Sequence, residues 1–183
     1  MDINESTIDN KNYTHIIQNI CDNLPDIPNV EVIVNNAGIQ EGNTIDTNLR
    51  GTINVTEKYI SNAIKSVVFI ASASATTGAE FPEYAASKGG ILAYMKNVAL
   101  RVSKYGATSN AISPGGVKTE LNKHILNNEV LYKQVLDETL LGKWMDPEEV
   151  AEFVYFIAVV NKSMTGEDIF VDNGEKLKSN FIW

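Results

Sequence analysis

Short apolar runs alternate in this chain with stretches whose apolar residues recur every three or four positions. The runs at 30–34 and 66–71 are rich in valine and isoleucine and end at polar or small residues, which predicts strands buried on both faces. The helical patterns lie at 44–63 and 84–102. This alternation predicts an α/β domain with helices on both faces of a mostly parallel sheet.

The first residues also carry a helical pattern. Apolar side chains recur at three and four over residues 7–24, and Pro25 ends the pattern. Cys21 lies among isoleucines at helical spacing, so we expect it in the core. Further elements are expected as strands at 107–112 and 169–171, a helix-prone stretch at 118–140, and a helix that begins at Asp146 and Pro147.

Composition limits the class of protein. With 183 residues, 44% hydrophobic and 21% charged, the chain is expected to form one domain over residues 1–183. A net charge of −8 disfavours nucleic acid and anionic membranes as partners, because both attract basic surfaces. One cysteine and two separated histidines leave no internal disulfide and no metal site. No apolar stretch is long enough to span a bilayer, so we expect a cytoplasmic protein.

Tyr84 and Lys88 form a chemical pair. They are four residues apart at the start of a predicted helix and so share one face of it. A tyrosine with a pKa of about 10 is a poor base at neutral pH, but a neighbouring cation lowers that pKa by about 1 to 3 units. The pair therefore suits proton transfer. Ser72, or its neighbour Ser74, could hydrogen-bond a substrate oxygen beside Tyr84.

These residues belong to an ordered set along the chain. The set comprises Asn35-Asn36-Ala37-Gly38 after a strand, Asn48 in the next helix, Ser72, the Tyr84/Lys88 pair, and Pro114-Gly115 with Thr119 after a further strand. The chain resembles the classical short-chain dehydrogenase/reductase family at these five places, in that family's order and near its spacings. The resemblance covers essentially all of residues 1–183 and implies a Rossmann-type, doubly wound parallel sheet.

The resemblance also implies an activity, the transfer of a hydride between NAD or NADP and a carbonyl or alcohol. By this resemblance Tyr84 is the general acid/base, and Lys88 holds the nicotinamide ribose and lowers the Tyr84 pKa. Ser72 polarises the carbonyl, and Asn48 supports a proton-relay water. The cofactor contacts expected from the family are Asn35, Ala37 and Gly38 on the adenosine side, and Pro114, Gly115, Val117 and Thr119 at the nicotinamide and diphosphate. For Asn35 and Pro114, ordinary turn chemistry at a strand end is the alternative.

The chain departs from the family pattern most strongly at its front. No glycine-rich phosphate-binding turn precedes the Asn35 strand. Met1-Asp2-Ile3-Asn4 resembles the end of the family's third strand, so two strand–helix crossovers of about 30 residues each are expected to be missing. We therefore expect an N-terminally truncated Rossmann fold, a weakened cofactor site and an exposed edge at the Asn35 strand. Shorter loops are also expected between Gly38 and Asn48 and between Ser72 and Tyr84.

Two other functions compete with this interpretation. One is a non-enzymatic remnant that does not bind a dinucleotide. The other is a nucleotide-sugar epimerase, but that would need a substrate domain after Pro114-Gly115, where only residues 118–140 are available. The apolar positions of 118–140 suggest a hydrophobic carbonyl substrate, although core packing explains them equally well. Family members assemble as dimers or tetramers, so a homo-oligomer is expected, with Tyr59, Met95 and Val98 on the outer helix faces.

Overall fold

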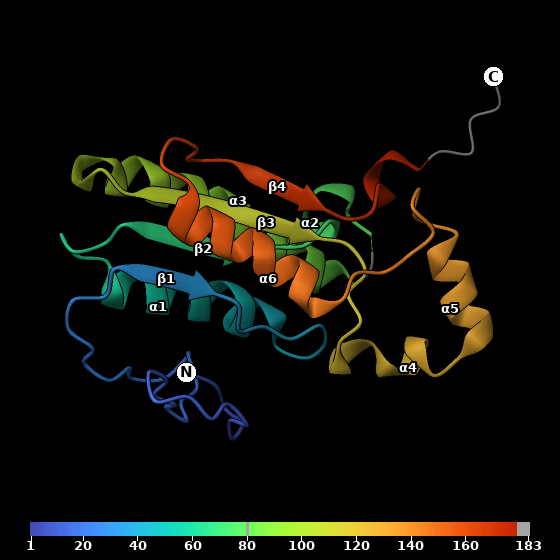
Figure 1. Ribbon diagram of the computed structural model, residues 1–183, viewed down its shortest axis with the longest axis horizontal. Helices are drawn as coiled ribbons and strands as arrows, with labels where there is room; N and C mark the ends of the chain where they lie inside the picture. Colours follow the sequence, from blue (N-terminus) through green and yellow to red (C-terminus); the bar gives the residue numbers. More distant parts are fainter. Residues whose placement is uncertain (80, 179–183) are drawn as a thin grey trace.

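A computed structural model describes residues 1–79 and 81–178 of the chain. Its centre is a parallel sheet of four strands in the order β1-β2-β3-β4 (Figure 1). The register pairs Val34 with Val68 and Val68 with Asn110. The strands are β1 (Val32–Asn35), β2 (Ser66–Ile70), β3 (Thr108–Pro114) and β4 (Asp168–Val171). The predicted α/β architecture is confirmed.

Helices cover both faces of this sheet. On one face, α1 (Thr52–Tyr59), which continues a π-helical segment Ile45–Gly51, and α3 (Pro82–Val102) enclose the larger core. On the other face α6 (Pro147–Tyr155) packs over β3, and the π-helical segment Phe156–Val160 that continues it packs over β2 (Figure 1). Neighbouring residues of β2 point to opposite faces, so Val67 and Phe69 enter the first core while Val68 enters the second.

The edge strand β1 is covered on one face only. Ile33 is buried, whereas Val32 and Val34 are 37% and 43% exposed. The prediction that this strand is buried on both faces is therefore wrong, because α6 and the segment Phe156–Val160 lie over β3 and β2 and leave the outer face of β1 open. The predicted position of this strand at a sheet edge is confirmed.

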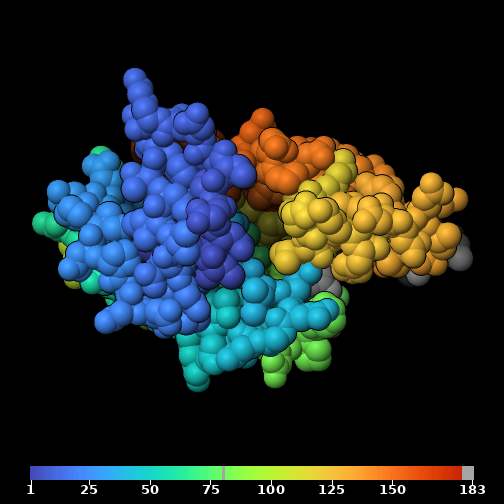
Figure 2. Space-filling model, turned by 90° about the horizontal axis from the view of Figure 1, so that it is seen from below, coloured from blue at the N-terminus to red at the C-terminus, as the bar shows by residue number. Residues whose placement is uncertain are grey.

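The helix predicted over residues 7–24 does not form. This segment contains turns and one isolated bridge from Asp2 to Ile17, and Cys21 is exposed rather than in the core. Asparagine side chains explain the difference, because the backbone N–H of Asn12 donates to Asn10 Oδ1 and that of Cys21 donates to Asn19 Oδ1. Such local bonds compete with helix formation. Figure 2 shows these first residues (blue) spread over one side of the molecule.

The remaining helices lie mostly at the carboxyl ends of the strands. There α2 (Ser74–Thr77) follows β2, and α4 (Lys123–Leu126) and α5 (Glu129–Leu136) project from the body of the molecule (Figures 1 and 2). Short 3₁₀ turns occur at Ser103–Tyr105, Glu120–Asn122 and Glu175–Leu177, and a second π-helical segment, Phe156–Val160, follows α6. The helix-prone character of 118–140 is confirmed.

The start of α6 also agrees with its prediction. Asp146 is the N-cap, Pro147 is the first helical residue, and the backbone N–H of Asp146 donates to Glu149 Oε2 at 2.9 Å. By contrast, Tyr59, Met95 and Val98 do not lie on outer helix faces. They are 7%, 0% and 0% exposed and belong to the core between α1, α3 and the sheet. None of the helices that the structure describes has the length and apolar character needed to cross a bilayer.

Candidate active site

A cavity of about 620 Å³ lies where the carboxyl ends of the strands meet the α4–α5 segment. Ligands of open parallel sheets bind at this edge. Of the residues predicted for the site, eight line the cavity: Gly38, Ser72, Tyr84, Lys88, Pro114, Gly115, Val117 and Thr119. The lining also includes Asn36, Gln40, Phe81, Leu121, Asn122, His124, Ile125, Val135, Glu138, Trp144, Val150 and Glu175.

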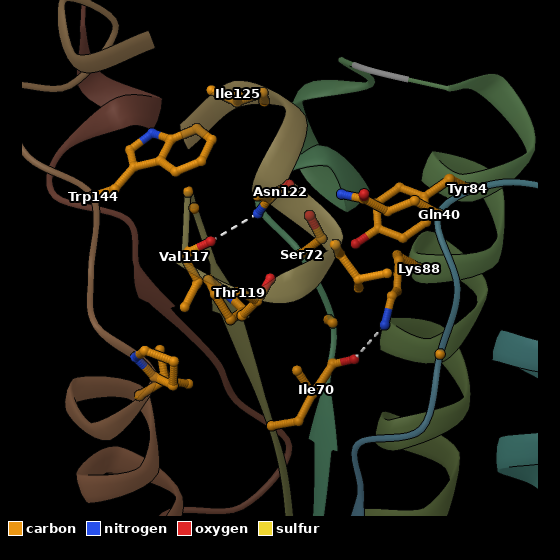
Figure 3. Close-up of a pocket in the computed structure, with 18 of the residues that line it drawn as sticks. Gln40, Ile70, Ser72, Tyr84, Lys88, Val117, Thr119, Asn122, Ile125 and Trp144 are labelled. Atoms are coloured by element: carbon orange, nitrogen blue, oxygen red, sulfur yellow. Dashed lines mark hydrogen bonds between the residues drawn. The ribbon is translucent and has the colours of Figure 1, made fainter. Parts of the chain in front are cut away.

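Tyr84 and Lys88 stand together in the first two turns of α3, where Pro82 begins the helix. Lys88 Nζ lies 5.7 Å from the centroid of the Tyr84 ring. The ammonium group also donates a hydrogen bond of 2.8 Å to the backbone carbonyl of Ile70, at the end of β2 (Figure 3). Tyr84 and Lys88 therefore lie on the same face of α3, as predicted, and the hydrogen bond to the end of β2 holds the Lys88 side chain in place.

Burial changes the acidity of this lysine. Lys88 is 5% exposed, and loss of water around the ammonium lowers its pKa from 10.5 to about 8. A cation in such surroundings acts strongly on nearby groups, because the low local dielectric weakens screening. Lys88 is thus a buried charge beside the Tyr84 ring, and buried charges in a cavity are typical of functional sites.

Ser72 follows β2 and faces the same cavity. Its oxygen accepts hydrogen bonds from Ser74 Oγ at 2.7 Å and from the Ser74 backbone N–H at 3.2 Å. A hydroxyl has two acceptor lone pairs and one proton, so these two bonds leave the Ser72 proton to be donated elsewhere. Ser74, the alternative to Ser72, is 4% exposed and acts on Ser72 rather than lining the cavity.

Asn48 lies behind the cavity wall. It is fully buried, donates to the Ile39 carbonyl at 2.9 Å and to Ser87 Oγ at 3.1 Å, and accepts from the Ile39 backbone N–H at 2.8 Å. Ser87 in turn donates to the carbonyl oxygen of Tyr84. Asn48 therefore ties the loop after β1 to the first turns of α3, and its proton-relay role stays a prediction.

Asn35 and Ala37 are not among the lining residues, although Asn36 and Gly38 are. The Asn35 side chain donates to Thr56 Oγ1 at 3.0 Å and so ties β1 to α1. Gly38 is needed for close approach, because a Cβ there would lie 3.1 Å from Asn48 Oδ1 and 3.5 Å from Lys88 Nζ. The structure thus favours turn and packing chemistry for Asn35 and a place in the site for Gly38.

The loop after β3 forms the opposite rim. Val117 pairs with Met145 in an isolated parallel bridge, and Asn122 Nδ2 donates to the Val117 carbonyl at 2.8 Å (Figure 3). A Cβ at Gly115 would come within 2.5 Å of Glu175 Oε2 and 3.0 Å of the Asp172 backbone, so only glycine fits. Gly115 thus lets residues 172–175 approach the loop closely, and Gly116, the next residue, does the same for Trp144.

Sequence reasoning missed Trp144, Gln40 and Phe81 as site residues. Trp144 packs over Gly116, where a Cβ would lie 2.1 Å from the indole ring. The signal was present, because a second glycine next to Gly115 indicates that a bulky group comes close to the backbone. The sequence gives no indication of which distant side chain fills that space.

The sheet, its covering helices and the site at its carboxyl edge define a Rossmann-type α/β protein. Residues 9–176 match the family model described as enoyl-(acyl carrier protein) reductase. The chain is 30% identical over 182 residues to the 3-oxoacyl-(acyl-carrier-protein) reductase FabG of Buchnera aphidicola subsp. Acyrthosiphon pisum. This alignment covers 90% of the chain. The chain belongs to the short-chain dehydrogenase/reductase family, as its ordered motifs predict.

Solved structures agree with this assignment. A short-chain dehydrogenase family protein from Francisella tularensis subsp. tularensis SCHU S4 aligns with a TM-score of 0.73 and 28% identity, covering 81% of this chain and 72% of that one. A 4-hydroxyisoleucine dehydrogenase mutant complexed with NADH and succinate aligns with a TM-score of 0.73 and 26% identity, covering 82% and 70%. The chain spans 74% of the Buchnera FabG and 66% of the Vibrio cholerae FabG.

Proposed function

We propose that this chain is an NAD(P)-dependent oxidoreductase that moves a hydride between a nicotinamide cofactor and a carbonyl or alcohol, with Tyr84 as general acid/base. One observation carries the proposal: Tyr84, Lys88 and Ser72 line one cavity at the carboxyl edge of a parallel sheet. Membership of the short-chain dehydrogenase/reductase family supports the same reaction class.

The residues around Lys88 suit the nicotinamide side of such a cofactor. A lysine ammonium carries three donors, and the Ile70 carbonyl accepts one of them, so Lys88 can also donate to ribose hydroxyls. Gly38 keeps open a space beside Lys88 Nζ that a Cβ would fill. The related 4-hydroxyisoleucine dehydrogenase has been solved with NADH, which supports this class of cofactor. Gly38, Pro114, Gly115, Val117 and Thr119 would form the rest of the contact. Asn35 and Ala37, the other two predicted contacts, do not line the cavity.

The protein side of the chemistry follows from the hydrogen bonds. When bound, the nicotinamide supplies or accepts the hydride. The Ser72 hydroxyl donates a hydrogen bond to the substrate oxygen and polarises the carbonyl, while Tyr84 transfers its proton to the same oxygen in reduction and takes it back in oxidation. The Lys88 cation favours the phenolate form of Tyr84, which lowers the cost of that transfer.

Replacing the Tyr84 hydroxyl tests the proposal directly. We expect Tyr84→Phe to lower the rate of NADH- or NADPH-dependent ketone reduction by about 10²- to 10⁴-fold, since general acid catalysis contributes that much. The rate is followed by the absorbance of the reduced nicotinamide, at millimolar cofactor. Tyr155→Phe is the matched control, because Tyr155 is 62% exposed on α6 and should leave the rate unchanged. Equal rates for the wild type and Tyr84→Phe would refute the role of Tyr84.

A non-enzymatic chain that does not bind a dinucleotide is the second candidate function. The observation in its favour is that the first glycine is Gly38, so residues 1–37 hold no glycine-rich turn for the diphosphate. Absence of turnover by the wild type together with absence of cofactor binding would support this candidate over the first.

The proposal also covers the domain organisation, the cellular location and the oligomeric state of the protein. We propose that residues 1–183 act as one partial Rossmann domain, that the protein is cytoplasmic, and that it forms a homo-oligomer, either dimer or tetramer. With Tyr59, Met95 and Val98 in the core, an interface on the outer face of α3 would have to use residues such as Leu100, which is 79% exposed.

A further inference from the structure

Several apolar side chains line the cavity across from the catalytic residues, and the indole of Trp144 is the largest of them. Trp144 is 7% exposed and lies against the backbone at Gly116, where no Cβ fits. Tyr132 packs edge-on against the indole with ring centroids 6.0 Å apart. Because the loop and Tyr132 hold it from two sides, the indole is a fixed wall rather than a mobile cover.

Other apolar side chains continue this wall. Figure 3 shows Trp144 and Ile125 on one side of the cavity, and Tyr84 and Lys88 on the other. Phe81 and Leu121 also line the cavity yet are 47% and 56% exposed, so a ligand that covers them would remove apolar surface from water. The apolar wall, as used below, comprises Leu121, Ile125, Val135, Trp144 and Val150.

The charged groups of the cavity disfavour an anionic substrate. Among the lining residues that the structure describes, Lys88 is the one lysine, His124 is the one histidine and arginine is absent, whereas Glu138 and Glu175 contribute carboxylates. The ammonium of Lys88 already bonds the Ile70 carbonyl and lies on the catalytic side. A substrate carboxylate placed along the apolar wall would therefore lose its hydration and meet like charge.

A sugar would have to place several hydroxyl groups along the same apolar wall. The amide nitrogen of Asn122, which lines the cavity, is already bonded to the Val117 carbonyl (Figure 3). Thr119, His124 and Glu138 are then the lining residues left to meet a hydroxyl group there. Hydroxyl groups buried without partners cost free energy, so a polyol substituent binds poorly against such a wall.

We infer that the site takes an uncharged carbonyl compound whose substituent is aliphatic or aromatic and lies along the apolar wall. The inference rests on the proposed function for the position of the reacting carbonyl, which Ser72 and Tyr84 hold. It goes further by naming the substrate class, and by assigning Trp144, placed by Gly116, as a specificity-determining residue.

Trp144 itself reports the binding. The chain has two tryptophans, and Trp183 lies outside the described residues, so Trp183→Phe leaves Trp144 as the fluorophore in the cavity. This protein is titrated with benzylacetone, with rhamnose, and with levulinate and its methyl ester, which share the 4-oxopentanoyl chain but differ in charge. We expect saturable quenching by benzylacetone and methyl levulinate, and affinity for the ester at least about tenfold above that for levulinate.

A glycine variant tests the wall independently. Gly116→Ala should displace the indole and weaken benzylacetone binding by about tenfold, the scale of a lost apolar contact. Gly89→Ala is the control, because its Cβ would lie an ordinary 3.6 Å from the Ala75 carbonyl. Urea unfolding checks that both variants fold, and if Gly116→Ala does not, the ester–acid comparison decides.

The outcomes separate this inference from the proposed function. Binding of the uncharged ketones without any turnover would support the inference and count against the proposed function. Tighter binding or faster turnover of levulinate or rhamnose would support an oxidoreductase and overturn the inference. Absence of quenching by every ligand would also overturn it.

Discussion

Lys88 is a buried lysine, and its surroundings differ strongly from those of a lysine side chain in water. Its pKa falls from 10.5 to about 8 because the ammonium is buried. Between these two values the unfolded chain holds the proton while the folded protein has released it. The free energy of unfolding therefore rises with pH across this window. Below about pH 8 both states are charged, and the fold bears the full cost of the buried charge.

This cost can be measured with an uncharged side chain of similar length. The shift from 10.5 to about 8 corresponds to about 3 kcal/mol at roughly 1.4 kcal/mol per unit. Lys88→Met also loses the bond to Ile70, worth about 1 kcal/mol. At pH 7 we expect the variant to be more stable than the wild type by about 2 kcal/mol, an advantage that disappears as the pH rises above about 10.

Urea unfolding at several pH values gives this comparison. Lys133→Met, on the exposed face of α5, is the control and should change stability equally at every pH. A stability difference between Lys88→Met and the wild type that stays constant from pH 7 to about 10.5 would contradict the lowered pKa.

At the residue scale, the sequence predicts the site best where chemistry and strand ends coincide. Ser72, Tyr84, Lys88 and Gly115 line the cavity because each follows a strand or begins the helix beyond one. Asn48 does not line the cavity. Its side-chain amide can donate and accept several hydrogen bonds, and it uses them to connect buried segments behind the cavity wall. Trp144 comes from a segment with no chemical signature, so its place depends on tertiary packing alone.

At the element scale, β1 is the least protected strand. It ends the strand order β1-β2-β3-β4, and Val32 and Val34 expose apolar side chains beside its outer edge. Edge strands of this kind pair with other chains unless charges or prolines prevent it. The sheet therefore carries a surface that favours self-association at high protein concentration.

Two lysines on this strand should suppress such association. We expect the wild type to form species larger than a tetramer as its concentration rises, and the double variant Val32→Lys, Val34→Lys to form far fewer, since repulsion opposes edge pairing. Light scattering coupled to size exclusion measures this. Leu177→Lys, at a residue that is 71% exposed, is the control for added charge alone. Equal growth of large species in all three proteins would show that β1 is not involved.

Helices and strands differ in how far the sequence predicts them. The central strands and α3 combine periodicity with packing on a sheet, and their predicted positions differ from the observed ones by a few residues. Residues 7–24 have the periodicity of a helix, but Ile8 and Ile17 are 60% and 55% exposed there. An amphipathic pattern produces a helix only where its apolar face is buried, and local asparagine bonds prevail where it is not.

At the scale of the whole molecule, the cavity depends on segments from along the entire chain. The loop after β1, the turn after β2, the start of α3, the loop after β3 and the α4–α5 segment all meet at the carboxyl edge of the sheet (Figure 1). This convergence follows from parallel strands, because their ends lie at one edge. The α/β pattern therefore predicts where the site lies, while the apolar wall depends on the tertiary packing of Trp144 and of the segment that carries Leu121, Ile125 and Val135.

The most direct test of this account is a titration of the purified Trp183→Phe protein with NADH and with NADPH, in which the quenching of Trp144 fluorescence is measured. We predict saturable binding in the range of about millimolar or tighter, with residues 1–37 lacking a glycine turn for the diphosphate. Lys88→Met should abolish this binding, because the lysine faces the nicotinamide side, and the cofactor that binds tighter identifies the natural one. Absence of quenching by either dinucleotide, or equal binding by Lys88→Met, would contradict the account.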